Sequence, residues 1–236
     1  MAARAQIFPT AGWWFLALLG AAILAFWPVY FAVLPWGPEP LVHLHMAGVT
    51  LWFALLISQP FLIRQGRFAL HRSLGRLSLA LVPYIATTAL LLAHSRFQRM
   101  SPEAFARDGH SLYLPLVGVA LFLVSYGLAM RHRRKALLHA RFMIGTAFSF
   151  MDPIVARFLF FYTPVPAGPF LYPAIAFGLA DLGLLALLLA DRGRKGSEAF
   201  RRLLVIFVTA HLGWFTLAQT EPWFAFARWF TNLPLT

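Results

Sequence analysis

Seven stretches of the sequence are apolar over the roughly 20 residues that a helix needs to cross a lipid bilayer. They cover about residues 13–34, 41–63, 74–93, 112–130, 142–162, 170–190 and 203–218. Because backbone groups in lipid must pair within the segment or in a closed barrel, the sequence predicts an all-α fold. We expect a polytopic transmembrane bundle of seven helices that forms a single transmembrane domain over residues 1–236. An aromatic stretch at about residues 222–230 predicts a short C-terminal helix in the membrane interface.

The composition agrees with a chain dissolved in lipid. Hydrophobic residues make up 60% and charged residues 12%, whereas a soluble domain carries roughly 25% charged residues. The mean hydropathy is +0.71. The chain has no cysteine, which excludes disulfides, thiolate metal ligands and a cysteine nucleophile.

The formal net charge of +12 is explained by membrane topology, and no nucleic-acid partner is expected. Three predicted loops, those after the second, fourth and sixth spans, hold most of the basic residues: Arg64, Arg67, Arg72, Arg76; Arg131, Arg133, Arg134, Lys135, Arg141; and Arg192, Arg194, Lys195, Arg201, Arg202. Because basic loops stay in the cytoplasm, the N-terminus is predicted inside and the C-terminus outside. The expected location is the bacterial cytoplasmic (inner) membrane, with anionic lipid headgroups bound at the cytoplasmic loops.

Ionisable residues within the spans are candidate functional groups, because burying them in lipid is unfavourable without a partner. By the predicted spans, the deep ones are Asp152, Arg157, Asp181 and His211. An ion pair of Arg157 with Asp152 or Asp181 would only tie helices together, and a proton or ion path is the functional alternative. Both stay open.

Histidines near the outer ends of the spans offer a metal site. His43 and His45 point about 200° apart on a helix, so we expect His45 to face inward and His43 to lie in the interface. The predicted metal ligands are His45, His211, His94, Asp152 and Asp181, for copper, iron or zinc.

A second candidate site lies near the cytoplasmic ends of two spans, where a His accompanies an Arg. We expect His71 and His139 to bind a haem iron axially, with Arg72 and Arg141 on the propionates and Met143 nearby. Alternatively, these side chains only reach towards lipid phosphates at the interface.

The segments "HLHMAG", "LWFALLISQPFLIR", "HRSLGRLS", "LHARFMIGTA" and "DPIVAR" together resemble a family of uncharacterised bacterial polytopic membrane proteins. The His-Arg and His-x-Arg-x-Met elements are also distantly similar to those of transmembrane b-type cytochromes, and "HLHM" to helix starts in haem-copper membrane proteins. The resemblance to these two classes implies haem between helices and traffic with a quinone or a respiratory complex. The sequence departs from them in helix four, which lacks an internal histidine.

Three functions follow as hypotheses. The first is a membrane redox protein with histidine-bound haem or metal. The second is a zinc-dependent membrane hydrolase using His45, Asp152, Asp181 and His211. The third is a transporter, or an accessory protein of a membrane complex without its own chemistry. Whether the chain is an enzyme is left open at this point.

Overall fold

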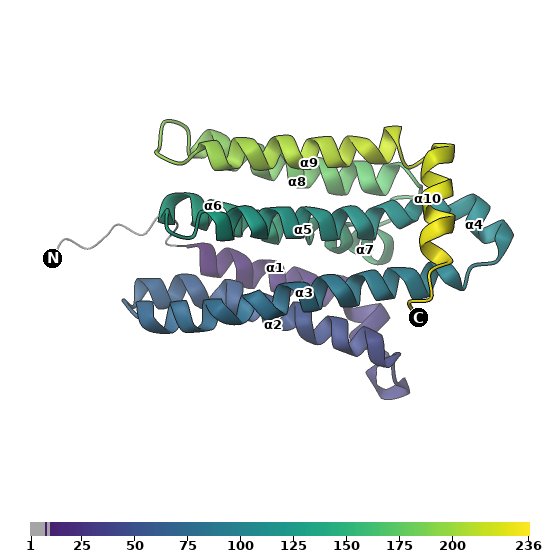
Figure 1. Ribbon diagram of the computed structural model, residues 1–236, viewed down its shortest axis with the longest axis horizontal. Coiled ribbons are helices and arrows are strands. Elements are labelled where there is room, and N and C mark those ends of the chain that lie inside the picture. The colour runs from purple at the N-terminus through teal and green to yellow at the C-terminus, as the bar shows by residue number, and fades with distance from the viewer. Residues whose placement is uncertain (1–7, 9) are drawn as a thin grey trace. The chain divides into compact units, whose positions relative to one another are not determined.

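The structure, a computed structural model, describes Phe8 and residues 10–236 and divides into two compact units, residues 1–88 and 89–236 (Figure 1). The described residues form helices and no strand, which confirms the predicted all-α fold. The single domain over residues 1–236 stays a prediction, and each unit is described by itself.

Six helical stretches of the described chain are long and apolar enough to cross a membrane: Ala11–Trp36, Pro40–Arg64, Phe68–Gln98, Pro102–Arg131, Ala136–Tyr162 and Leu171–Ala190. Such helices are those of an integral membrane protein. A seventh span qualifies only if α9 (Glu198–Thr216) and α10 (Glu221–Thr231) are taken together, and these two helices are bent by 97°. Because α9 begins with charged residues, its apolar part is too short to qualify as a span by itself.

The first unit contains α1 (Ala11–Phe26), a π-helical turn η1 (Trp27–Phe31), a 3₁₀ turn η2 (Leu34–Trp36), α2 (Pro40–Arg64) and the first part of α3 (Phe68–Gln98). Pro28, which lies in η1, cannot donate a backbone hydrogen bond, so the α-helical pattern ends there. The α1 and α2 helices pack together, with the Trp13 and Phe61 rings edge to face at 5.3 Å. Between α2 and α3, the Tyr84 hydroxyl donates to the Leu44 carbonyl at 2.8 Å.

The second unit begins within α3 and continues with α4 (Pro102–Asp108), η3 (Gly109–Leu112), α5 (Tyr113–Arg131), α6 (Ala136–Phe148), α7 (Met151–Tyr162) and α8 (Leu171–Ala190), followed by α9 and α10. Within this unit α5 packs against α6, α7 against α8, and α9 against α5, α6 and α8 (Figure 1). The α8 and α9 helices therefore run as antiparallel neighbours joined by a short turn.

The span predicted at residues 142–162 is broken into α6 and α7. Pro153 lies in the first turn of α7 and has no N–H for the carbonyl of Ser149, so the hydrogen-bond ladder is interrupted there. The hydroxyl of the same residue, Ser149, donates to the Thr146 carbonyl at 2.8 Å, and this side-chain bond also favours bending. The break places Asp152 at the start of α7, facing a cavity rather than a regular helix surface.

The bend between α9 and α10 buries one face of the aromatic C-terminal segment. Trp223, Ala227 and Phe230 of α10 join a buried cluster with Trp214 of α9 and Phe97 of α3. Figure 1 shows α10 lying across the ends of its neighbouring helices. Its predicted place in the membrane interface stays a prediction.

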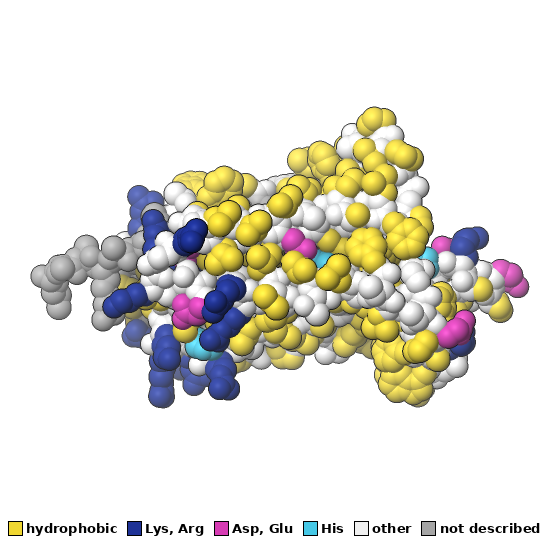
Figure 2. Space-filling model, turned by 90° about the horizontal axis from the view of Figure 1, so that it is seen from above, with side chains coloured by type: hydrophobic (Ala, Val, Ile, Leu, Met, Phe, Trp, Pro, Cys, Tyr) yellow, Lys and Arg dark blue, Asp and Glu magenta, His cyan; other side chains and the backbone are white. Residues whose placement is uncertain are grey.

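Basic residues of the second unit gather at one end. The α5–α6 and α8–α9 turns lie at the same end of this unit (Figure 1) and hold these residues: Arg131, Arg133, Arg134, Lys135, Arg192, Arg194, Lys195, Arg201 and Arg202. Figure 2 shows Lys and Arg gathered at helix ends, with hydrophobic side chains covering much of the surface between them. This distribution suits a bilayer between the charged ends, and the predicted orientation of the termini stays a prediction.

Candidate functional site

His211, in the second half of α9, and Asp181, near the middle of α8, form a hydrogen-bonded pair. The imidazole Nδ1 lies 2.9 and 3.0 Å from the two carboxylate oxygens. The side chain of His211 is 6% exposed and that of Asp181 is 22% exposed. An ionised carboxylate only accepts hydrogen bonds, so Nδ1 carries a hydrogen and Nε2 remains as the second site of the ring.

Two phenylalanines fix the plane of this imidazole. The Phe177 ring, also on α8, stacks on it with centroids 4.2 Å apart and an interplanar angle of 8°. The Phe207 ring approaches edge to face at 5.7 Å. Packed between the two rings, the imidazole of His211 is held in a fixed orientation towards Asp181.

Asp152 shares a small buried cavity with His211. The cavity is lined by both side chains together with Ser149, Phe177 and apolar residues of α5 and α8, and it has space of about 10 Å³ for the centre of a water molecule. That is close to the space one water needs. The Oδ1 atom of Asp152 is buried and finds no hydrogen-bond partner among the described residues.

Arg157 lies one turn after Asp152 on α7. Its Nη1 donates to the Pro153 carbonyl at 3.1 Å, and Asp152 is within electrostatic reach of both Arg157 and His211. The sequence left open an Arg157 pair with Asp152 or with Asp181. In the structure Asp181 pairs with His211 instead, so the deep polar residues form a group around the histidine.

A separate ion pair lies at the basic end of the second unit. Arg141 donates from Nε and Nη2 to the two carboxylate oxygens of Asp191, at 2.6 and 2.9 Å, and from Nη1 to the Leu137 carbonyl at 2.7 Å. Both side chains are buried. Binding of a haem propionate by Arg141, as the sequence predicts, would require this ion pair to open.

The other predicted haem residues are divided between the two units. His139 donates from Nδ1 to the Ala129 carbonyl at 2.9 Å, which leaves Nε2 as an acceptor. Met143, on the same helix, is partly buried. His71 and Arg72 belong to the first unit, where Arg72 is exposed, so axial ligation by His71 and His139 together stays a prediction.

The predicted metal ligands are also distributed. His45, in the first unit, lies 3.0 Å from the Thr88 hydroxyl through Nδ1, and His43 lies 3.0 Å from the Tyr30 hydroxyl. His94, in the second unit, lies 2.7 Å from the Thr236 hydroxyl through Nδ1 and packs on Phe230. Among the described residues, no group of three or more His, Asp and Glu side chains could hold a metal ion. A metal between His45 and His211 stays a prediction.

One buried charged residue, Asp191, was not recognised from the sequence as important. It is the first residue after α8, in a turn that otherwise reads as a basic loop. The available signal was a lone acidic residue directly at the end of a long apolar helix, where the carboxylate must find a cation or remain in water.

The chain matches no protein-family model, no curated protein and no solved structure. The second unit holds one histidine between a hydrogen-bonded carboxylate and a cavity lined by a second carboxylate. Carboxyl and imidazole groups exchange protons readily, and a water molecule between them extends their reach.

Proposed function

We propose that this integral membrane protein is a proton-coupled transporter, in which Asp152, His211 and Asp181 pass a proton through the second unit. The observation that carries the proposal is His211, hydrogen-bonded to Asp181 on one side and lining the cavity of Asp152 on the other. Chains of Asp, Glu and His within membrane helices are typical of proton relays.

A comparison with the Arg141–Asp191 ion pair supports a functional rather than a purely structural role for Asp152, His211 and Asp181. Arg141 and Asp191 satisfy each other fully and are almost completely buried. The polar groups around His211 are satisfied less completely. The Oδ1 atom of Asp152 has no hydrogen-bond partner among the described residues, and the side chain of Asp181 is 22% exposed. A group built only to join helices would gain from satisfying both carboxylates.

The proposed transfer conserves protons at each step. Asp152, when protonated, gives its proton through one water to Nε2 of His211 and becomes a carboxylate. The imidazolium then releases the Nδ1 proton to Asp181, and the neutral ring is left with its hydrogen on Nε2. Net transfer is complete when Asp181, whose side chain is partly exposed, releases its proton to water. The neutral ring must return to the tautomer with its hydrogen on Nδ1, and Asp152 must be protonated again, before the next proton passes. The solute coupled to this proton movement is not specified by the site.

Two measurements on the full chain test the proposal. In nanodiscs, infrared difference spectra between acidic and alkaline pH should show carboxyl bands that disappear in D152N and D181N. In proteoliposomes with an internal pH dye, an imposed gradient should collapse faster with the wild type than with either variant. Asp108→Asn, at the exposed end of α4, is the matched control. If neither carboxyl titrates, the proposal is wrong, whatever the flux.

A histidine-ligated haem is the second candidate, favoured by the Nδ1 bond of His139 to the Ala129 carbonyl. Such a bond orients a ligand ring and leaves Nε2 for a metal. Of the two predicted axial ligands the second unit contains His139, whereas His71 belongs to the first unit, and Arg141 is held by Asp191. Absorption spectra with and without reductant decide the matter, since a haem band that is lost in H139A would favour this candidate.

A further inference from the structure

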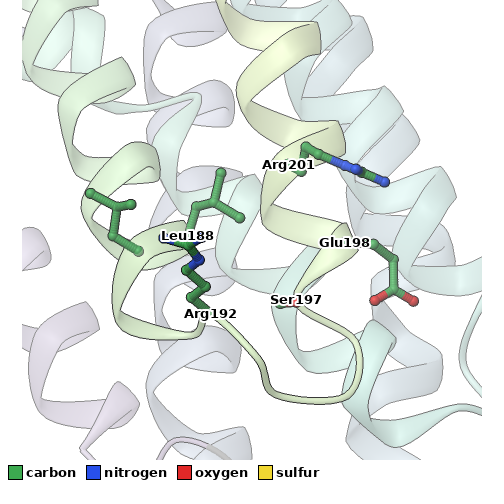
Figure 3. Close-up of a pocket in the computed structure, with 6 residues that line it drawn as sticks. Leu188, Arg192, Ser197, Glu198 and Arg201 are labelled. Atoms are coloured by element: carbon green, nitrogen blue, oxygen red, sulfur yellow. The ribbon is translucent and has the colours of Figure 1, made fainter.

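A groove opens between the end of α8 and the start of α9, apart from the proton site. Its volume is about 420 Å³, and it is lined by Leu188, Leu189, Arg192, Ser197, Glu198 and Arg201. Figure 3 shows Arg192 on one side of the turn and Arg201 and Glu198 extending from α9 on the other. The groove thus combines two guanidinium groups, a hydroxyl and a carboxylate with two leucines.

The two arginines are available to a ligand. Neither Arg192 nor Arg201 makes a side-chain hydrogen bond or ion pair with another described residue, and both are exposed. Arg141, whose guanidinium lies beside Gly196 of this turn, is by contrast engaged with Asp191. With Glu198 included, the groove carries one net positive charge, which matches a single phosphodiester.

The position of the groove along the α8 span indicates whether a bound phosphodiester would belong to a lipid or to a soluble anion. The α8 helix is a candidate membrane span that ends at Ala190, and Arg192 follows two residues later. The ends of spans lie at the level of lipid headgroups. Leu188 and Leu189 belong to the last turn of this span, and Leu189 is 59% exposed. A soluble anion would gain nothing from these leucines, whereas an acyl chain would pack on them.

We propose that this groove binds an anionic phospholipid of the phosphatidylglycerol type. The phosphate accepts hydrogen bonds from Arg192 and Arg201, and Ser197 adds a hydroxyl donor. The headgroup hydroxyls donate to Glu198, and one acyl chain lies along Leu188 and Leu189. Arginine suits this role, because its planar fork binds phosphate oxygens in pairs.

Native mass spectrometry of the detergent-purified full chain tests the proposal. Phosphatidylglycerol should remain bound at lower concentration than phosphatidylcholine with the same acyl chains. The R192Q/R201Q variant should weaken phosphatidylglycerol binding roughly tenfold, as expected for two basic groups near a headgroup. The matched control is R133Q/R134Q, which removes the same charge from the neighbouring α5–α6 turn, outside the groove.

The remaining arms separate the sources of the phosphate. Leu189→Gln should weaken phosphatidylglycerol binding while leaving the fold unchanged by circular dichroism. Equal loss of binding in R192Q/R201Q and R133Q/R134Q would mean that general electrostatics hold the lipid, and the proposal would be wrong. It would also be wrong if inorganic phosphate displaced the lipid at equal concentration, since the groove would then be a site for free anions.

Discussion

Arg141 of α6 and Asp191 after α8 bind each other through two hydrogen bonds, of 2.6 and 2.9 Å, while their side chains are 1% and 4% exposed. This ion pair joins two segments 50 residues apart in the chain. A third guanidinium bond, to the Leu137 carbonyl, leaves the arginine little freedom. The pair therefore fixes the α8–α9 turn against the start of α6.

The first prediction concerns this pair. Asp191→Asn should lower the free energy of unfolding by about 3–5 kcal/mol, because it leaves the buried Arg141 charge without its counterion. Arg141→Lys should also destabilise, since an ammonium group cannot form the paired bonds. Thermal unfolding in detergent measures both effects.

The exposed pair of Arg107 and Asp108 supplies the control. These two residues make a similar contact at 2.9 Å, but their side chains are 75% and 43% exposed. Asp108→Asn should change stability by less than about 1 kcal/mol. Equal effects of Asp191→Asn and Asp108→Asn would contradict a special role for the buried pair.

The second prediction concerns the close approach of α5 and α9. The Tyr113 hydroxyl donates to the Ala210 carbonyl at 2.7 Å and occupies the space in which a Cβ atom at Gly213 would lie. Gly213→Ala should therefore destabilise the protein by about 1–3 kcal/mol, the usual range for overpacking. Tyr113→Phe should relieve part of the clash in the double variant.

Gly178 is the matched glycine, since a Cβ atom there would have no neighbour within 4 Å. Gly178→Ala should leave the melting temperature unchanged or slightly raised, because alanine favours the helix. If both alanine variants behaved alike, the contact between Gly213 and Tyr113 would be wrong.

These glycines show what sequence alone can and cannot provide. Gly178 and Gly183 flank Asp181 and both suggest a close helix approach. In the structure Phe148 packs against Gly183, whereas nothing lies near Gly178. Composition and spacing identify a small residue, but the partner side chain comes from a distant helix and is not encoded locally.

The helices themselves were largely predictable. Six of the seven expected spans match stretches that qualify as membrane spans, because length and hydropathy are local properties of the chain. The expected span at residues 203–218 differs, since α9 starts earlier, at Glu198, and includes Arg201 and Arg202. The sequence indicated the apolar part of this helix but not that charged residues continue it.

The candidate site was predictable only in part. Asp152, Asp181 and His211 stood out as ionisable residues in apolar stretches, yet their arrangement did not. Asp181 and His211 are 30 positions apart in the chain, and the segment between them includes a turn that brings α8 and α9 side by side. Helix periodicity fixes which residues share a face of one helix, whereas the pairing of two helices depends on packing along their whole length.

The third prediction concerns Pro153. Alanine there would restore the donor missing for the Ser149 carbonyl, and α6 and α7 should tend towards one continuous helix. Asp152 would then turn away from the cavity of His211. We expect Pro153→Ala to keep or raise thermal stability while lowering proton flux in proteoliposomes by about tenfold or more, the scale of a misplaced catalytic group.

Pro173, near the start of α8, is the control for removal of a proline. Pro173→Ala lies outside the Asp152 cavity and should leave proton flux unchanged. Wild-type flux in Pro153→Ala would show that the break between α6 and α7 does not position Asp152.

The last prediction separates the two roles of His211, as a hydrogen-bond donor and as a proton carrier. Asparagine places an amide nitrogen close to the position of the imidazole Nδ1, so His211→Asn should keep the bond to Asp181 but offers no second nitrogen that titrates. We expect near wild-type stability and loss of proton transfer. His211→Phe keeps a ring to stack on Phe177 but leaves the Asp181 carboxylate without its donor, so the free energy of unfolding should fall by about 1–3 kcal/mol. The two variants should therefore differ in stability, His211→Phe being the less stable, while they lose proton flux to a similar extent. Undiminished proton flux in His211→Asn would remove the imidazole from the pathway, and the Asp181–His211 pair would then be only a link between α8 and α9.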